Sequence, residues 1–411
     1  MLTSLFYPPT VGIGEEGAPD VAVQGALVAV AAVAGLAALS STDVRRLTVR
    51  VPAVFASMTC VLMVLTAVQS SQPFDGIARG VWFGSVGLVL MWLVVGEDRW
   101  ADVLVVLCAP IAVFAVASVA AYPFADVEFQ GGGEFFNERL FPWPRLRGLA
   151  VNHTVLGVAG AGLIVTAVGV GQSLRRSTSI AFAAIGVLSL LASHSRAALG
   201  AVAVAVVLEV ARSRREYLVP VVAAGAAIVG LGLLAGGGAN TLDRSDEQEA
   251  IGQSGELGVL TGRGDVWNEA WNFGLERPMT GHGVGEFAAL TGEQFEAGHR
   301  LWDPVHAHNV ALELFTDQGL LGLANLLVLI VAVVVLRHRI PAGGLGLFVA
   351  VGLHSVVEGL LYGAPHTGWM FVVVVVAWMA RSESAVGVAE PTIYLDRPET
   401  DHHPYDHPVG G

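Results

Sequence analysis

Three arginines are the side chains in this sequence best suited to binding an anion. Arg147, Arg196 and Arg263 each stand beside an apolar segment, in Pro-Arg-Leu-Arg-Gly, Ser-His-Ser-Arg-Ala and Thr-Gly-Arg-Gly-Asp. Arginine close to apolar surroundings is costly and usually has an anionic partner. Each one alone is also explained by snorkelling or by pairing with Asp or Glu. Together they predict a polyanion site, because the planar guanidinium donates two parallel hydrogen bonds to phosphate.

Two histidines, His306 and His308, stand directly before Asn309 at the start of an apolar stretch. Histidine is the side chain best placed to accept a proton near neutral pH, and a helix start favours the neutral imidazole that a base needs. Capping of the helix or simple solvation explains the same pattern. A His-x-His pair without a third ligand at a suitable spacing does not predict a metal site.

A second polar pair, His354 and Glu358, falls one helical turn apart in the apolar run at 344–362. The pair could line a transport path. Glu358 lies near the outer end of that run, where it could equally position an arginine or an acceptor molecule. Glu313 lies about 140° round a helix from His308, so we expect it to be structural.

The composition decides what kind of protein must hold these residues. Of 411 residues, 54% are hydrophobic and only 14% are charged. A soluble domain carries roughly 25% charged residues, so this chain lacks the polar surface to face water on all sides. The composition predicts an all-α integral membrane protein, and no nucleic acid is expected as a partner.

Long apolar runs predict about eleven transmembrane helices, or twelve, since each span needs about 20 apolar residues. The runs lie at roughly 21–40, 51–68, 79–95, 102–121, 149–171, 179–194, 197–211, 218–235, 320–336, 344–362 and 367–380. Many are rich in Gly and Ala, which lets helices approach closely in lipid. Short basic loops follow the first, fifth, seventh, ninth and eleventh runs, whereas the loop after the third run, Glu97-Asp98-Arg99, is neutral at best. The positive-inside rule places this side of the bundle in the cytoplasm. The N-terminus is then outside and the C-terminus inside.

This topology divides the chain into five parts. They are an extracytoplasmic N-terminus at 1–20, helices one to eight at 21–235 with an outer loop at 122–148, a large extracytoplasmic loop at 236–308, helices nine to eleven at 309–380, and a disordered cytoplasmic tail at 381–411. The large loop is too long for a simple connector. Its aromatic residues have spacings that predict short amphipathic helices, which could cap the bundle and build a site at the membrane surface. These aromatics are Trp267, Trp271, Phe273, Phe287 and Phe295.

Several motifs resemble those of the bacterial O-antigen ligase and O-antigen polymerase family. His308-Asn309, followed after nine residues by Gly319-x-x-Gly322, resembles that family's His-Asn-x9-Gly-x-x-Gly signature. A second element is similar to the family's large-loop pattern: Gly262-Arg263 with Trp267, Pro278 and Gly281-His282-Gly283-Val284-Gly285. A third is similar to its Ser-Arg element at a helix start: Ser193-His194-Ser195-Arg196-Ala197-Ala198-Leu199.

The resemblance covers roughly 147–363, and the first four apolar runs carry none of its motifs. The family usually has about twelve spans with both ends inside, so the predicted outside N-terminus is a departure. The resemblance implies a GT-C-like glycosyltransferase of cell-envelope polysaccharide biosynthesis, without cofactor or metal. It would move a glycan from undecaprenyl diphosphate to an acceptor hydroxyl on the outer face of the bacterial cytoplasmic membrane, with inversion.

The same resemblance implies roles for individual residues. His308 would be the general base and Arg263 a second catalytic residue. Arg147, Arg196 and Arg263 would bind the diphosphate. His306, the competitor of His308, would contact the acceptor or be structural, as would Asn309 and Glu358.

Ligase and polymerase activities remain open, and the acceptor could be a glycan, lipid or protein. A polysaccharide or lipid transporter is the rival from another class. The nearly pure apolar character of the spans and the lack of an internal repeat count against it.

Overall fold

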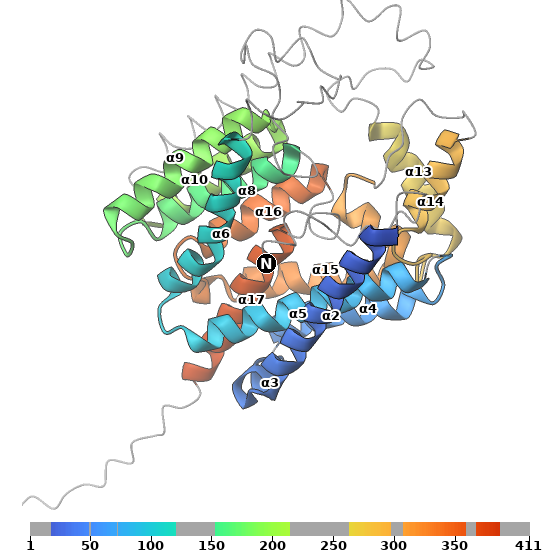
Figure 1. Cartoon of the computed structure of the whole chain (residues 1–411), viewed down its shortest axis with the longest axis horizontal. Helices are drawn as coiled ribbons and strands as arrows, with labels where there is room; N and C mark the ends of the chain where they lie inside the picture. The colour runs from blue at the N-terminus through green and yellow to red at the C-terminus, as the bar shows by residue number, and fades with distance from the viewer. Residues whose placement is uncertain are drawn as a thin grey trace, which may run out of the picture.

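The computed structural model describes residues 18–48, 51–71, 73–120, 153–213, 263–296, 307–358 and 367–386. Within these residues every regular element is a helix, as the apolar runs predict. Figure 1 shows the helices packed into a bundle, with the α9–α10 pair and the α13–α14 pair on opposite flanks of the view.

Most helices follow the predicted runs closely, but the helix that contains the run predicted at 320–336 begins ten residues earlier, at Val310. In chain order they are α2 (Ala18–Ser40), α3 (Thr42–Thr48), α4 (Val51–Ala67), α5 (Pro73–Gly96), α6 (Trp100–Ala120), α8 (His153–Gly169), α9 (Arg176–Ser193), α10 (Arg196–Ser213), α13 (Arg263–Glu276), α14 (Glu286–Glu296), α15 (Val310–Val335), the 3-10 turn η2 (Arg337–Arg339), α16 (Gly344–Val357) and α17 (Thr367–Val386). The predicted run at 218–235 lies outside the described residues. The helix α17 continues past 381, where the sequence predicts the start of a tail.

The described helices fit a membrane protein. Four of them, in α5, α6, α9 and α15, are long and apolar enough to cross a membrane, and shorter apolar helices accompany them. Large apolar side chains such as Val33 of α2, Leu188 of α9 and Val331 of α15 are exposed on the outside of the bundle. A lipid environment accommodates such a surface, whereas water does not. The total of eleven or twelve spans stays a prediction.

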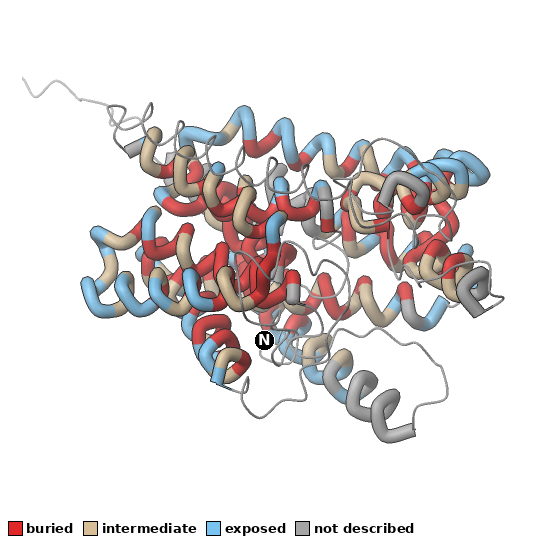
Figure 2. The backbone as a smooth tube through the Cα atoms, turned by 90° about the horizontal axis from the view of Figure 1, so that it is seen from above, coloured by how far each residue is buried: buried red, intermediate tan, exposed pale blue. Residues whose placement is uncertain are grey.

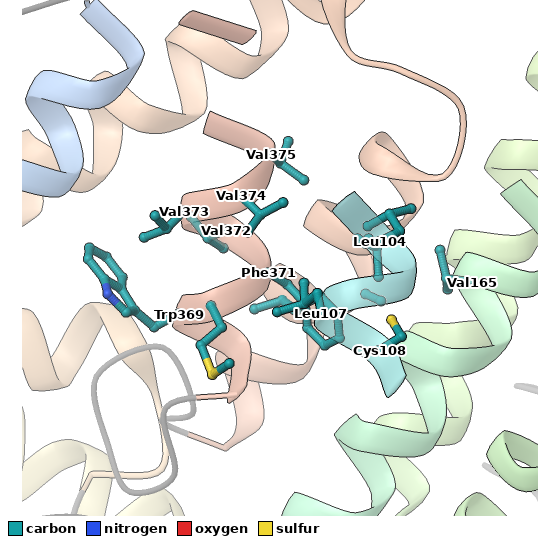
Figure 3. Close-up of a cluster of buried hydrophobic side chains, with 14 of the residues drawn as sticks. Leu104, Leu107, Cys108, Val165, Trp369, Phe371, Val372, Val373, Val374 and Val375 are labelled. Atoms are coloured by element: carbon teal, nitrogen blue, oxygen red, sulfur yellow. The ribbon is translucent and has the colours of Figure 1, made fainter. Parts of the chain in front are cut away.

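The helix α17 forms the centre of the core. Every side chain from Trp369 to Ala377 is buried, and the helix packs against α4, α5, α8 and α16. A helix that is apolar on all sides is stable only when other helices surround it. Figure 2 shows the buried residues gathered in the middle of the bundle, and Figure 3 shows part of this cluster, with labelled side chains from α6, α8 and α17.

Small residues let neighbouring helices approach closely, as the Gly-rich runs predict. Gly160 of α8 and Gly186 of α9 lie opposite each other where the two helices are in close contact. A Cβ atom added at Gly160 would lie 2.7 Å from the carbonyl oxygen of Gly186, and one added at Gly186 would lie 2.8 Å from that of Gly160. Neither distance is compatible with a side chain, so glycine is required for the close packing of α8 on α9.

The basic turns come together at one end of the bundle, which we call the basic end. Arg381 of α17 donates to the carbonyl of Val94 in α5 at 2.7 Å, and Arg212 of α10 donates to that of Pro341 at 3.3 Å. Arg99 donates to a carbonyl in the turn after α8 at 3.4 Å. Segments far apart in the sequence are therefore joined at this end. The turns at the opposite end carry the residues discussed next.

Candidate active site

His308 and Glu358 lie together although fifty residues separate them in the chain. The His308 Nδ1 atom is 3.3 Å from the Glu358 Oε2 atom, and the two side chains are 18% and 10% exposed. The pair joins the start of α15 to the end of α16. When the ring donates its Nδ1–H to the carboxylate, the lone pair of the neutral imidazole is on Nε2. In this tautomer Nε2 is the ring atom that can accept a proton.

The local sequence explains why His308 stands outside the helix. Asn309 caps α15, because its Oδ1 atom accepts hydrogen bonds from the backbone N–H groups of Ala311 at 2.9 Å and Leu312 at 3.2 Å. His308 precedes this cap and has a φ of 51°. Left-handed backbone is uncommon for residues other than glycine, although His, Asn and Asp adopt it more readily than most. A helical-wheel argument from His308 to Glu313 therefore does not apply.

The helix α13 packs against the residue that precedes His308. Val266 and Ala270 of α13 form a small buried cluster with Phe287 of α14 and with Ala307, which is fully buried. Arg263, the first residue of α13, comes three residues before Val266, which belongs to the same cluster as Ala307.

The helix α15 is broken at Gly319, and the turn between α13 and α14 is inserted at the break. The N–H of Leu320 donates to the carbonyl of Pro278 at 2.7 Å, while the N–H of His282 donates to the carbonyl of Thr316 at 2.8 Å. Backbone groups that the break leaves without helical partners are therefore bonded to the turn. These reciprocal bonds fix α13 and α14 relative to the helix that follows His308.

Only glycine fits at this junction. Gly319 has a φ of 63° with a ψ of −151°, and a Cβ atom there would lie 2.6 Å from the carbonyl oxygen of Pro278. Gly281 has a φ of 66°, and its Cβ atom would lie 2.4 Å from the backbone nitrogen of Gln318. Both the steric contacts and the backbone angles exclude other residues. The glycines of two separate sequence motifs thus meet in one structural feature.

The α4–α5 turn is attached to the same assembly. The Glu286 carboxylate at the start of α14 accepts a hydrogen bond from the hydroxyl of Ser70 at 2.8 Å and one from that of Ser71 at 2.6 Å. Thr280 donates to Gln69 of the same turn at 3.1 Å. The first half of the chain, which carries no family motif, therefore helps to hold the segment that contains Arg263.

The predicted site residues are not all brought together. His308 contacts Glu358 in the structure. Asn309, the next residue after His308, is the N-cap of α15. Arg196 is exposed and is the first residue of α10, on the turn after α9. Arg147 and His306 lie outside the described residues.

Three further charged residues interact with one another in apolar helices. The sequence predicts Glu313 to be structural and does not single out Asp317 or Arg79. Glu313 of α15 interacts electrostatically with Glu358, with Asp317 on its own helix and with Arg79 of α5. The signal that could have found them is their occurrence in otherwise apolar helices, since ionisable residues in such segments are rare and usually functional. Their interactions with one another could not be read from spacing, because Arg79 and Glu358 come from parts of the chain far from α15.

Comparison with known families gives an independent result for part of this region. Residues 181–327 match the family model described as O-antigen ligase. A search of curated proteins found no match. The matched segment includes Arg196, Arg263 and His308, whereas Glu358 lies beyond it. The match agrees with the motifs and supports the O-antigen ligase and O-antigen polymerase family for this chain.

Proposed function

We propose that the protein is a membrane glycosyltransferase that moves a glycan from undecaprenyl diphosphate to an acceptor hydroxyl on the outer face of the cytoplasmic membrane. The observation that carries this proposal is the part-buried His308–Glu358 pair, whose neighbour Ala307 packs on α13. A general base oriented by a carboxylate, next to the helix that Arg263 begins, is suited to transfer from a diphosphate carrier.

In the proposed reaction His308 removes the proton of the acceptor hydroxyl. The acceptor oxygen attacks the anomeric carbon as the bond from that carbon to the diphosphate oxygen breaks. The bonding electron pair leaves with the diphosphate, and the hydroxyl proton goes to Nε2 of His308. Glu358 stabilises the resulting imidazolium through Nδ1. A single displacement of this kind inverts the anomeric centre.

Arginines are proposed to stabilise the charge of the leaving diphosphate. Arg263 and Arg196 are the first residues of α13 and α10. The start of a helix favours anions because of its free N–H groups and its dipole, and arginine adds a bidentate donor at the same place. Arg147 is proposed to assist from the segment before α8. His306 and Asn309 are proposed to act near the acceptor or as structural residues.

The same chemistry serves a ligase or a polymerase, which differ in the acceptor. The family description favours a ligase, and a polysaccharide polymerase is the alternative. The length of the product distinguishes them, because a ligase transfers one glycan per acceptor whereas a polymerase yields a ladder of repeats.

The test is transfer from undecaprenyl-diphosphate-linked glycan by the purified full-length protein in detergent with EDTA. We expect His308→Ala to lose about 10²–10⁴-fold in rate, the usual loss when a general base is removed. His338→Ala, at an exposed position in η2, is the control and should keep the wild-type rate. His306→Ala should be affected far less than His308→Ala. Near-normal transfer by His308→Ala would remove this residue from the mechanism, and loss of activity with EDTA alone would indicate a metal-dependent enzyme.

A further inference from the structure

Three large apolar side chains form an exposed stripe along α13 and the turn that follows it. Trp271 and Leu275 lie one helical turn apart, and Met279 comes four residues further along the chain. Their exposed fractions are 47%, 50% and 58%. We call these three residues the apolar stripe. Large apolar side chains gathered on one surface usually mark contact with a membrane or with another molecule.

A polar stripe runs beside the apolar stripe on the same helix. Asn268, Asn272 and Glu276 are exposed and follow one another at the same spacing of four residues. The side of α13 that carries Val266 and Ala270 is buried against the rest of the protein. The exposed surface of α13 is therefore divided into one apolar and one polar part, as in helices that lie in the plane of a membrane surface.

The apolar stripe is continuous with the exposed apolar surface of α15. At the break in α15, the N–H of Leu321 donates to the carbonyl of Met279 at 3.4 Å, beside the bond from Leu320 to Pro278. Leu320 and Leu321 are themselves exposed, and α15 is one of the candidate membrane spans. Exposed apolar residues then continue on the face of α15 that Leu320 begins, at Leu327, Val331 and Val334. Lipid that covers this face of α15 therefore reaches Met279 without a gap.

The contact of α13 with α15 keeps the apolar stripe on the outside. The rings of Trp271 and Phe315 lie 5.0 Å apart, centre to centre. Phe315 also packs against Gly274, where an added Cβ atom would lie 2.4 Å from the ring. This close approach fixes the rotation of α13 about its axis, so the rest of the Trp271 ring stays exposed. Tryptophan is enriched where membrane meets water, because its ring is largely apolar and carries one polar N–H group.

We propose that α13 lies on the surface of the lipid bilayer, at the end of the bundle that holds His308, with the apolar stripe inserted into the lipid. Helices of this kind enter the boundary between headgroups and acyl chains by about 5–10 Å. The polar stripe then faces the headgroups and water. Continuity with α15 favours lipid as the partner over a second protein chain.

The placement also bears on the proposed function, and this part of the inference rests on it. The helix α13 begins at Arg263. A helix in the plane of the membrane holds both of its ends at about the same depth, so Arg263 lies at the level of the headgroups. The diphosphate of a lipid-linked donor lies at the same level. The donor is therefore presented to Arg263 by the bilayer rather than from solution.

The experiment measures how accessible nitroxide spin labels on α13 are to oxygen, which concentrates in lipid, and to a water-soluble nickel chelate. The full-length protein, in nanodiscs of phosphatidylethanolamine and phosphatidylglycerol, carries one added cysteine at a time. The parent protein with Cys60 and Cys108 gives the background. Labels at Leu275→Cys and Met279→Cys should have a ratio of oxygen to nickel accessibility several times higher than the label at Asn272→Cys, the matched control on the polar stripe.

A label at Leu327→Cys, on the exposed face of α15, gives the reference value for lipid. The proposal is overturned if the labels on the apolar stripe resemble the one at Asn272→Cys, since the stripe then faces water. Shielding from both reagents would also overturn it, because a protein partner such as a second copy of the chain would then cover the stripe. The measurement needs no substrate, so failure to transfer a glycan would count against the proposed function alone.

Rates of glycan transfer in the same nanodiscs test the part that concerns the donor. Leu275→Glu places a charge in the lipid and should lower the rate several-fold, whereas Asn272→Glu places the same charge in the polar stripe and should keep the wild-type rate. Equal rates for the two variants would contradict the role of the apolar stripe in presenting Arg263 to the donor.

Discussion

The charged side chains at the two ends of the bundle differ in whether they form hydrogen bonds. At the basic end, arginines such as Arg381 and Arg212 donate to backbone carbonyls of neighbouring turns, so each charge is used to join helices. At the opposite end, the Glu313 carboxyl is buried without a hydrogen bond among the described residues, and His308 adopts left-handed backbone. Locally unfavourable features of this kind concentrate at functional sites, where the surrounding structure maintains them. This contrast is the reason for placing the candidate site at the end that holds His308.

The sidedness of the two ends is the prediction with the largest expected effect. A single cysteine at Glu276, exposed in α13, should react in intact cells with a membrane-impermeant maleimide, whereas one at His338 should react only after lysis. The reason is that the positive-inside rule places the basic end in the cytoplasm. The native cysteines, Cys60 and Cys108, give the background. Labelling of both new cysteines from the same side would disprove the predicted orientation.

The rate of glycan transfer should depend on the shape of the Arg263 side chain as well as on its charge. Arg263→Lys keeps the charge but loses the bidentate fork, so we expect transfer to fall roughly 10- to 100-fold while the protein is still expressed. Arg277→Lys lies on the same segment at an exposed position and should retain normal transfer. Rates of glycan transfer measure both. Equal rates for the two variants would contradict the assignment of Arg263 to the diphosphate.

The broken helix should tolerate no side chain. Gly319→Ala places a Cβ atom against the 278–281 turn, and its backbone angles alone cost about 1–3 kcal/mol, so we expect a lower Tm and reduced transfer. Gly352→Ala is the matched control, because nothing lies within 4 Å of its Cβ position and α16 is regular there. Thermal unfolding in detergent compares them. A Gly319→Ala protein as stable as Gly352→Ala would show that the inserted turn does not fix α15.

The smallest loss of stability is expected from replacing Asn309, the N-cap of α15. Asn309→Ala removes the acceptor for two backbone N–H groups and should destabilise the protein by about 1 kcal/mol. Because the cap adjoins His308, transfer should fall further than this loss of stability explains. Asn272→Ala, exposed on α13, should change neither property. Stability and transfer rate measured on the same preparations test this, and an Asn309 variant with normal transfer would separate the cap from the site.

Much of the fold could be predicted from the sequence, because apolar runs and helix ends are local. Each predicted run within the described residues lies on a helix, and the expected change to a helix after Asn309 is found at Val310. The family was also predicted from local motifs, and the match over residues 181–327 agrees with them. The candidate roles of Arg147, Arg196, Arg263 and His308 stay predictions.

Only the tertiary structure joined His308 to Glu358. The two residues belong to different helices, and no spacing in the sequence reports that the start of one helix meets the end of another. The sequence also assigned Glu313 to the wrong geometry, because the angle of about 140° assumes that His308 is helical. His308 instead has a φ of 51° before the cap, and this backbone depends on long-range contacts such as the packing of Ala307 on α13. The position of a helix is determined by the few residues around each of its ends. The charge that faces the His308 imidazole is determined by residues far away in the sequence, which only the tertiary structure places beside it.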